Sequence, residues 1–345
     1  MGSGNVGVDP RLLEFMVCPR DRSTLRESGR ELICEQGHAY GIVDGVPVLL
    51  VEEVPFTHCD AQRALAATRA DAPQLMPAPV GDEIDPFVNK WIAATNGALY
   101  SHLAGKLKEY PIPNLRLPPG NGRLFLEVGC SWGRWCIAAA RIGYRPIGID
   151  PSLGGIRAAR HVAAQVGVDA LFVVGDGRYL PFHDGIFDQA FSYSVLQHLS
   201  KDNARATLRE IHRVLRPDGA SMIQMANKLG PRSLYNQMRH WFVKTEGFEV
   251  RYWLPGELLR AFREELGTTE VEVDGFFSLN PQISDLRFLP GKYRAVVRAS
   301  EAMRKAAHLV PPLRYLADSL YLKTLYLKTM TVATPANLPD LPTTR

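Results

Sequence analysis

The sequence has little cysteine and no long apolar run. Five cysteines are spread over 345 residues, and so sparse a set does not form the disulfide framework of a small secreted domain. No stretch approaches the roughly 18 consecutive apolar residues of a membrane-spanning helix, and the first residues lack the basic and apolar regions of a secretory signal. We therefore expect a cytoplasmic protein without a membrane span.

The chain also lacks a large excess of charge of one sign. It has 40 Lys and Arg residues and 36 Asp and Glu residues, which gives a formal net charge of +4. This near balance gives no argument for nucleic acid or a membrane as a partner of the whole chain. With 46% hydrophobic and 22% charged residues, the chain has the composition of a globular protein, and its length predicts about two domains.

The distribution of cysteine, proline and glycine divides the chain into three parts. Residues 10–54 form a compact unit with two cysteines and a histidine. Residues 55–120 are interrupted by prolines and predict a linker with helices that cap the site. Residues 121–330 form the larger domain, with insertions at 227–254 and 279–318 that are candidate lids.

Strands and helices alternate after residue 121, which is typical of an α/β fold with a parallel sheet covered on both faces. Seven strands are predicted, at residues 123–128, 146–150, 170–174, 187–193, 220–226, 269–277 and 319–328. Helices are predicted at residues 132–142, 153–165, 204–215, 256–266 and 294–309. The pattern therefore favours a seven-stranded sheet with helices on both sides.

A glycine-containing turn follows the first of these strands. Gly129, Ser131 and Gly133 separate the strand from the next helix, so backbone N–H groups face a ligand at the carboxyl edge of the sheet. The Gly-x-Gly-x-x-Gly fingerprint of dinucleotide binding is absent, because its last two glycine positions hold Ser131 and Arg134. A Walker phosphate loop is absent as well. The turn suits a ligand that approaches the backbone without a pyrophosphate.

Two acidic residues follow the next two strands. Asp150 ends the second strand, where a carboxylate accepts both hydroxyls of a ribose. It also has the position of a cap for the helix that starts near Ser152. Asp176 follows the third strand, where it would accept a hydrogen bond from an adenine amine or simply form a turn.

This ordered set resembles the class I S-adenosylmethionine-dependent methyltransferases, especially their small-molecule and quinone branch, over about residues 123–226. The resemblance implies a Rossmann-like methyltransferase fold and S-adenosylmethionine as cofactor. The implied cofactor-binding residues are Glu127, Gly129, Ser131, Trp132 and Gly133 around the methionine part, Asp150 at the ribose, Asp176 and Gly177 at the adenine, and Ser192 near the methyl group. Ser131 stands where the family more often has a second glycine.

The residues after the fourth strand indicate which class of molecule accepts the methyl group. Ser192-Tyr193-Ser194-Val195 lacks the Asn/Asp-Pro-Pro-aromatic pattern of amine methylases, and no cysteine nucleophile follows it. His198 is a candidate general base, since neutral imidazole accepts a proton near pH 7, and Tyr193 is a second candidate. Both also have a packing interpretation. We expect a small-molecule acceptor, free or linked to a lipid or sugar.

The N-terminal unit holds a candidate metal site. Cys18, Asp21, Cys34 and His38 supply four ligand atoms in two pairs. Residues 14–51 resemble a small zinc-ribbon-like domain that accompanies or activates several methyltransferases, and the resemblance implies a structural zinc ion. Asp21 stands where a second cysteine is expected. The alternative is a degenerate domain that folds without metal.

Two rival functions stay open at this point. A zinc motif of this spacing also precedes a methyltransferase that acts on ribosomal RNA, so an RNA base is the main alternative acceptor, although the balanced charge argues against nucleic acid. The other rival is a non-catalytic protein that binds the cofactor or a partner. The sequence leaves open the acceptor, the methylated atom and the oligomeric state.

Overall fold

The computed structural model describes residues 7–70, 84–95, 100, 103, 105–240, 250–277 and 282–327. The strands are β1 (Leu25–Ser28), β2 (Glu31–Cys34), β3 (Ala39–Val43), β4 (Val46–Leu49), β5 (Leu124–Val128), β6 (Arg145–Asp150), β7 (Leu171–Gly175), β8 (Phe187–Ser192), β9 (Leu215–Ala226), β10 (Gly267–Gly275) and β11 (Ser319–Leu327). The α-helices are α1 (Pro10–Leu13), α2 (Cys59–Thr68), α3 (Pro86–Thr95), α5 (Arg134–Arg141), α6 (Leu153–Gln165), α7 (Lys201–Val214), α8 (Pro231–His240), α9 (Pro255–Glu265) and α10 (Gly291–Leu309). Short 3₁₀ helices are η1 (Leu196–His198), η2 (Ile283–Phe288) and η3 (Pro311–Leu316).

The larger domain is built on the seven strands that the sequence predicts. They lie in the order β7-β6-β5-β8-β9-β11-β10. The first five strands in this order are parallel, whereas β11 runs antiparallel to both β9 and β10. The predicted α/β fold with a seven-stranded methyltransferase-type sheet is confirmed.

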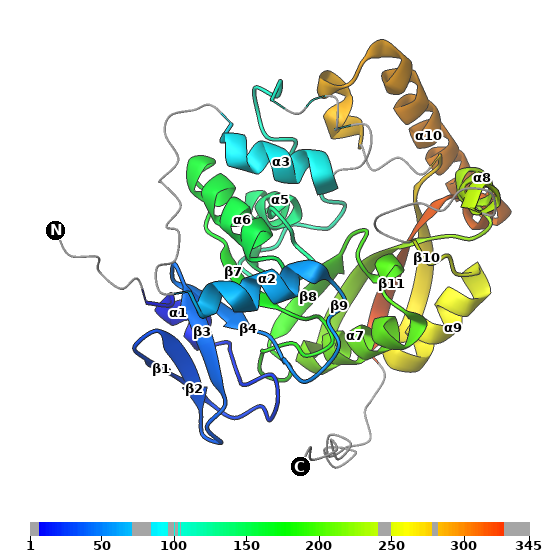
Figure 1. Ribbon diagram of the computed structural model, residues 1–345. Helices are drawn as coiled ribbons and strands as arrows, with labels where there is room; N and C mark the ends of the chain where they lie inside the picture. The colour runs from blue at the N-terminus through cyan, green and yellow to red at the C-terminus, as the bar shows by residue number, and fades with distance from the viewer. Residues whose placement is uncertain are drawn as a thin grey trace.

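Helices cover both faces of this sheet, with α3, α5 and α6 on one face and α7 and α9 on the other (Figure 1). Successive side chains of a strand point to opposite faces, and β5 shows this alternation. Phe125 packs in one cluster with Trp135 of α5, whereas Leu126 packs in another with Ile211 of α7. All four side chains are buried. The two apolar layers hold the carboxyl ends of the parallel strands at one edge.

Strand β9 differs from its prediction. It begins at Leu215 rather than at residue 220, because Pro217 and Gly219 do not end the chain's pairing with β8. Leu215 pairs with Phe187 and Ala220 pairs with Gln189, so the extra residues are accommodated by a shift in register. The preceding helix, predicted to reach residue 215, ends at Val214.

The N-terminal unit is continuous with the larger sheet. Strands β1 to β4 form an antiparallel meander, and β4 then pairs in parallel with β7, where Val48 lies opposite Val174 and Leu49 opposite Gly175. Arg157 of α6 forms an ion pair with Asp44, in the turn before β4. The sheet therefore has eleven strands (Figure 1).

The predicted insertions are partly described. The first contains α8, and its residues 241–249 lie outside the described part of the chain. The second contains η2, α10 and η3, with residues 279–281 outside the description. Helix α10 starts at Gly291, three residues before its predicted start.

None of the helices described is both long and apolar enough to cross a membrane.

Shared strand pairing predicts that the two parts unfold together. All five tryptophans lie after residue 90, so tryptophan fluorescence reports on the chain beyond the N-terminal unit. Leu32→Ala removes a fully buried side chain of the N-terminal unit and should lower the stability by about 2–5 kcal/mol. We expect the urea midpoint of tryptophan fluorescence to fall with it.

The matched control is Leu325→Ala, because Leu325 is 44% exposed. It should leave the midpoint nearly unchanged. A fluorescence midpoint that stays constant in Leu32→Ala, while far-ultraviolet circular dichroism shows an earlier transition, would show that the two parts unfold independently.

Candidate functional site

The turn between β5 and α5 has the backbone geometry that its glycines predict. Gly129 and Gly133 have φ values of 79° and 77°, and Ser131 has φ 46°. A side chain at Gly129 would also overlap Val195. Ser131 adopts a conformation that glycine adopts without strain, which explains why a glycine is common there in the resembling family. Its buried Oγ has no hydrogen-bond partner among the described residues.

Two carboxylates support this turn. Asp150 at the end of β6 accepts hydrogen bonds from the backbone N–H groups of Ser131 (2.8 Å) and Ser152 (2.9 Å). Glu127 accepts from the N–H of Cys136 at 2.7 Å, in the first turn of α5. Burial raises the pKa of both carboxyls, that of Glu127 to about 8. Asp150 therefore shapes the loop and also keeps lone pairs for a ligand.

Asp176 lies directly after β7 and is held by one arginine. Arg178 donates to it from its backbone N–H (2.9 Å), Nε (3.0 Å) and Nη2 (2.6 Å). A side chain at the adjacent Gly177 would come within 2.9 Å of Val128. Arg178 also donates to the carbonyl of Pro55 at 2.9 Å, so the turn after β7 is tied to the N-terminal part.

Two predicted residues lie beneath the loop rather than at its surface. Ser192 is fully buried, and its hydroxyl donates to the carbonyl of Val128 at 2.8 Å. It therefore ties β8 to β5. Ser192 is not among the described residues that line the crevice, and its contact with the cofactor stays a prediction. Gly133 permits close packing, since a Cβ there would lie 2.9 Å from Ala159.

A crevice of about 610 Å³ opens above this edge of the sheet, a size typical of small-ligand sites. The predicted residues that line it are Glu127, Gly129, Ser131, Trp132, Asp150, Asp176, Gly177, Tyr193 and His198. Further lining residues, which the sequence analysis did not assign to the site, include Thr57, His58, Asp60, Trp91, Arg134, Trp135, Gln197, Gln224, Asn236, Asp318 and Ser319. Tyr252, from the first insertion, also lines it.

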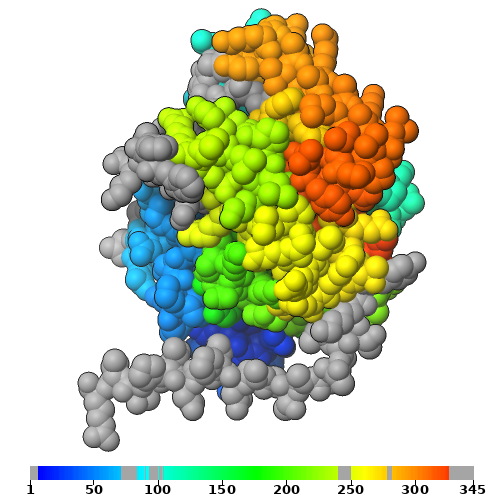
Figure 2. All heavy atoms as spheres, turned by 90° about the vertical axis from the view of Figure 1, so that its right-hand side faces the viewer, coloured from blue at the N-terminus to red at the C-terminus, as the bar shows by residue number. Residues whose placement is uncertain are grey.

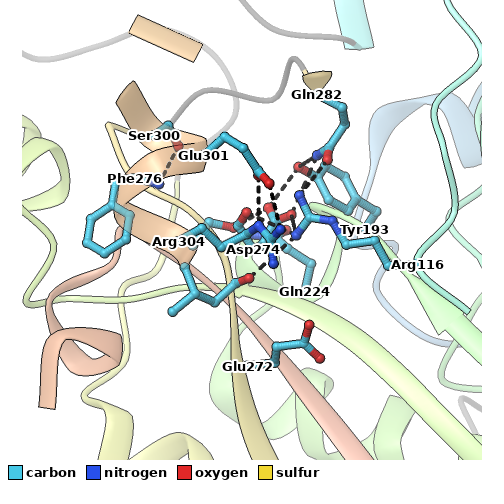
Figure 3. A network of polar contacts seen from close by, with 12 residues as sticks. Arg116, Tyr193, Gln224, Glu272, Asp274, Phe276, Gln282, Ser300, Glu301 and Arg304 are labelled. Carbon is cyan, nitrogen blue, oxygen red and sulfur yellow. Dashed lines mark hydrogen bonds and ion pairs between the residues drawn. The ribbon is translucent and has the colours of Figure 1, made fainter. Parts of the chain in front are cut away.

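Tyr193 belongs to a buried polar network centred on Asp274 of β10 (Figure 3). Asp274 Oδ2 accepts from the hydroxyls of Tyr193 (2.9 Å) and Ser319 (2.7 Å). Gln224 donates to Ser319 Oγ at 2.6 Å and accepts from the N–H of Ser194 at 2.7 Å. Strands β8, β9, β10 and β11 are therefore linked through polar side chains at one end of the crevice.

This network determines the chemistry of Tyr193. Burial and the neighbouring Asp274 carboxylate raise the pKa of the Tyr193 hydroxyl well above its ordinary value. The hydroxyl therefore stays protonated and donates to Asp274, which does not suit the predicted role of a base. Its ring packs 4.8 Å from that of Trp135, so Tyr193 forms a fixed aromatic wall. His198, in η1, lines the crevice and stays a candidate base.

Arg134 is the only lysine or arginine among the described residues that line the crevice. Its side chain is 8% exposed, and its Nη2 lies 3.7 Å from Asp285. The guanidinium also lies over the ring of Trp135 at 5.2 Å. Nε and Nη2 have no hydrogen-bond partner within the described ranges, which leaves donors for an anionic group of a ligand.

Part of the crevice wall comes from the segment that follows β4. His58 caps α2, with Nδ1 accepting from the N–H of Asp60 at 3.1 Å. The charges of His58 and Asp60 both affect the pKa of Asp150, in opposite directions. No sequence motif pointed to these residues, because their position depends on how α2 packs against α6.

The four predicted metal ligands lie together in the N-terminal unit. One ligand atom each of Cys18, Asp21, Cys34 and His38 lies within 4.8 Å of all the others. His38 Nδ1 is 3.5 Å from Cys18 Sγ, 3.3 Å from Cys34 Sγ and 2.8 Å from Asp21 Oδ2. Tetrahedral zinc, with bonds of about 2.0–2.3 Å, separates its ligand atoms by roughly 3.3–3.7 Å. The donor set therefore fits a zinc ion with little adjustment.

Comparison with known proteins assigns both parts of the chain. Residues 125–219 match a family model described as "Methyltransferase domain", and residues 9–45 match one described as "Trm112p-like protein". A UPF0434 protein of Vesicomyosocius okutanii is 53% identical over 47 residues, which are 13% of this chain and 80% of that protein. The N-terminal part therefore shares its family with these small proteins.

The larger domain has more distant relatives. A demethylmenaquinone methyltransferase of Corynebacterium kroppenstedtii is 34% identical over 104 residues, which are 30% of this chain and 42% of that protein. A solved S-adenosylmethionine-dependent methyltransferase of Methanosarcina mazei is 23% identical with a TM-score of 0.39, covering 48% of this chain and 90% of that one. The chain spans about half the length of the curated methyltransferases it matches.

The matched methyltransferase region contains the glycine turn, Asp150 and Asp176. The matched Trm112p-like region contains all four candidate metal ligands. The chain therefore carries a Trm112p-like domain ahead of a methyltransferase domain.

Proposed function

We propose that the chain transfers a methyl group from S-adenosylmethionine to a small-molecule acceptor, free or linked to a lipid or sugar. One observation carries this proposal. The crevice that begins at the glycine turn and Asp150 continues to a second wall formed by Tyr193, Asn236 and Tyr252, two of which come from the first insertion. A cofactor and a second small ligand therefore have adjoining places in one cavity.

The first part of the crevice fits the cofactor. Ser131 Oγ is a buried polar atom without a partner among the described residues. Gly129, at positive φ, adds no side chain to the turn. We assign the ribose hydroxyls to Asp150 and the adenine amine to Asp176. Glu127, Ser131 and Trp132 would surround the methionine part. The bound cofactor supplies a methyl group on a positively charged sulfonium.

The charges of the crevice favour a small acceptor over RNA. Its described lining contains five acidic residues, Asp60, Glu127, Asp150, Asp176 and Asp318, and one arginine. RNA binding depends on positive charge that neutralises phosphates, and this lining offers little. A relative of the methyltransferase domain is named a demethylmenaquinone methyltransferase, which also supports a small acceptor.

The chain's own residues would position and deprotonate the acceptor. Tyr193, fixed by Asp274, forms an aromatic wall that holds the acceptor toward the cofactor, and such positioning contributes much of the rate of group transfer. His198 would take the proton when the acceptor is a hydroxyl. The aromatic lining excludes water from the reacting atoms.

We also infer that Cys18, Asp21, Cys34 and His38 hold a structural zinc ion. The separations of their ligand atoms support tetrahedral binding. Asp21 Oδ1 accepts from the N–H (2.9 Å) and hydroxyl (2.6 Å) of Ser23, so its other oxygen is held toward Cys34 and His38. A fully coordinated site of this kind stabilises a fold and performs no chemistry.

The cofactor assignment predicts that Asp150→Asn weakens binding of S-adenosylmethionine. Loss of a charged acceptor typically costs about 1.5–3 kcal/mol, so we expect the Kd from calorimetry to rise roughly 10- to 100-fold. The control is Asp188→Asn, because Asp188 also accepts from a backbone N–H, that of Leu124 at 2.8 Å, but at the opposite end of β5. An equal effect of both variants would contradict the assignment.

Label transfer tests the proposed activity. The full chain is incubated with S-adenosylmethionine tritiated in the methyl group and with either small-molecule and lipid extracts or total RNA. We expect label in the organic extract. Label only in RNA would support the rival RNA methylase, and cofactor binding without transfer to either would support a non-catalytic protein.

Tyr193→Phe removes the hydroxyl and keeps the aromatic ring. We expect label transfer to fall about tenfold through a higher KM for the acceptor, because the ring loses its tie to Asp274, with cofactor affinity unchanged. Tyr321→Phe is the control, since Tyr321 lies 6.1 Å from Tyr193 between ring centroids and does not line the crevice. Loss of cofactor binding in Tyr193→Phe would refute this division of roles.

The zinc assignment predicts about one zinc ion per chain by elemental analysis. Cys34→Ser should abolish most of this content and lower the melting temperature, because the site loses a thiolate. Cys59→Ser is the matched control, since Cys59 is exposed and lies beside His58 and Asp60 in a second cluster of potential ligands. Metal-free protein of full stability would show a domain that folds without zinc.

A further inference from the structure

Exposed apolar side chains are concentrated in two short segments. Among the described residues, twelve large hydrophobic side chains are exposed, and eight of them lie within residues 229–238 and 309–316. They belong to α8 with the two residues before it, and to the end of α10 with η3. Leu309 is 86% exposed, the largest value in this set. Such clustering marks an interaction surface, whereas single exposed apolar residues do not.

The two segments lie against each other. Ser233 of α8 donates its backbone N–H to Asp318 at 2.8 Å, and Asn227 donates from Nδ2 to the carbonyl of Tyr315 at 2.7 Å. Figure 2 shows the yellow-green segment that contains α8 beside the orange and red segment that contains α10 and η3, on one side of the molecule. We call this surface, formed by residues 228–239 and 302–316, the α8–η3 face.

The charge of the α8–η3 face has one sign. Its residues include six Lys and Arg and no Asp or Glu, although the two kinds are nearly balanced in the whole chain. Arg304 is neutralised by Glu301, which lies just outside the face, at 2.6 Å. Two arginines lie over exposed aromatic rings, Arg232 over Tyr235 at 5.0 Å and Arg314 over Tyr315 at 5.8 Å. Aromatic, aliphatic and basic side chains are therefore interleaved.

We propose that the α8–η3 face binds the surface of an anionic lipid bilayer. Exposed aliphatic side chains enter the acyl boundary, aromatic rings lie at the level of the headgroups, and lysine or arginine pairs with anionic lipids at about 1 kcal/mol each. Free phosphate or an RNA backbone would match the basic residues but would leave Leu309, Val310 and Leu316 in water. The binding is peripheral.

Docking in this way would bring the crevice close to the membrane. Asn236 of α8 lines the crevice, while Leu234, Tyr235 and Met238 of the same helix are exposed on the α8–η3 face. One helix therefore contributes to both surfaces. The inference goes beyond the proposed methyl transfer and does not depend on it, because membrane binding is measured without turnover.

Vesicle co-sedimentation tests the proposal with the full, zinc-replete chain. We expect binding to vesicles that contain about 30% phosphatidylglycerol in phosphatidylcholine, and at least tenfold weaker binding to pure phosphatidylcholine, because the anionic lipids supply the electrostatic attraction. Binding should also fall at high salt. Equal binding to both vesicles, or no binding to either, would overturn the proposal.

Two double variants separate the apolar and basic contributions. Leu309→Ser with Leu316→Ser, and Lys305→Glu with Arg314→Glu, should each weaken binding to the anionic vesicles about tenfold or more. Leu309, Leu316 and Lys305 are exposed, Arg314 is half-buried, and none of the four lines the crevice, so the melting temperature and the Kd for S-adenosylmethionine should stay nearly unchanged. Leu325→Ser, at an exposed leucine outside the face, is the control.

Wild-type affinity in both double variants, with unchanged stability, would place membrane binding elsewhere and reject this face. Retention of the chain by a single-stranded RNA homopolymer, but not by anionic vesicles, would likewise reject a lipid surface in favour of nucleic acid.

Discussion

The parallel pairing of β4 with β7 is the constraint on which the proposed cofactor site depends. Leu49 lies opposite Gly175, one residue before Asp176, so the N-terminal domain fixes the end of the strand that presents this carboxylate. Arg178, which holds Asp176, also donates to the carbonyl of Pro55. The chain then continues to His58 and Asp60, which line the crevice. The segment that follows the N-terminal unit therefore forms part of the crevice wall, while the unit itself pairs with the strand that leads to Asp176.

Buried acidic groups line the proposed cofactor site. Glu127 accepts a hydrogen bond from the backbone N–H of Cys136, and burial raises its pKa to about 8, so burial disfavours the ionised form of this carboxyl. A positively charged ligand offsets that cost and favours the ionised form. Burial also raises the pKa of the Asp150 carboxyl. Both groups are consistent with a cationic sulfonium nucleoside.

The sequence predicted those parts of the site that depend on local order along the chain. Gly129, Asp150 and Asp176 each follow a strand directly, and parallel strands bring their ends to one edge. Asp274, Arg134 and His58 were not predicted. Asp274 acts through Tyr193, 81 residues away in sequence, and His58 reaches the crevice through the packing of α2. Such contacts depend on tertiary structure, which no local spacing encodes. Ser192 is likewise at the carboxyl end of its strand, but its hydroxyl is buried and donates to the carbonyl of Val128.

Charge is separated in space within a chain of nearly balanced composition. The crevice lining holds five acidic residues and one arginine among its described residues, whereas the charged residues of the α8–η3 face are all basic. The overall charge of +4 averages over both surfaces, so it excludes neither a cationic ligand nor an anionic surface. Helix α8 contributes to both surfaces. On the proposed functions, this helix would place the opening of the crevice next to the membrane surface that the α8–η3 face binds.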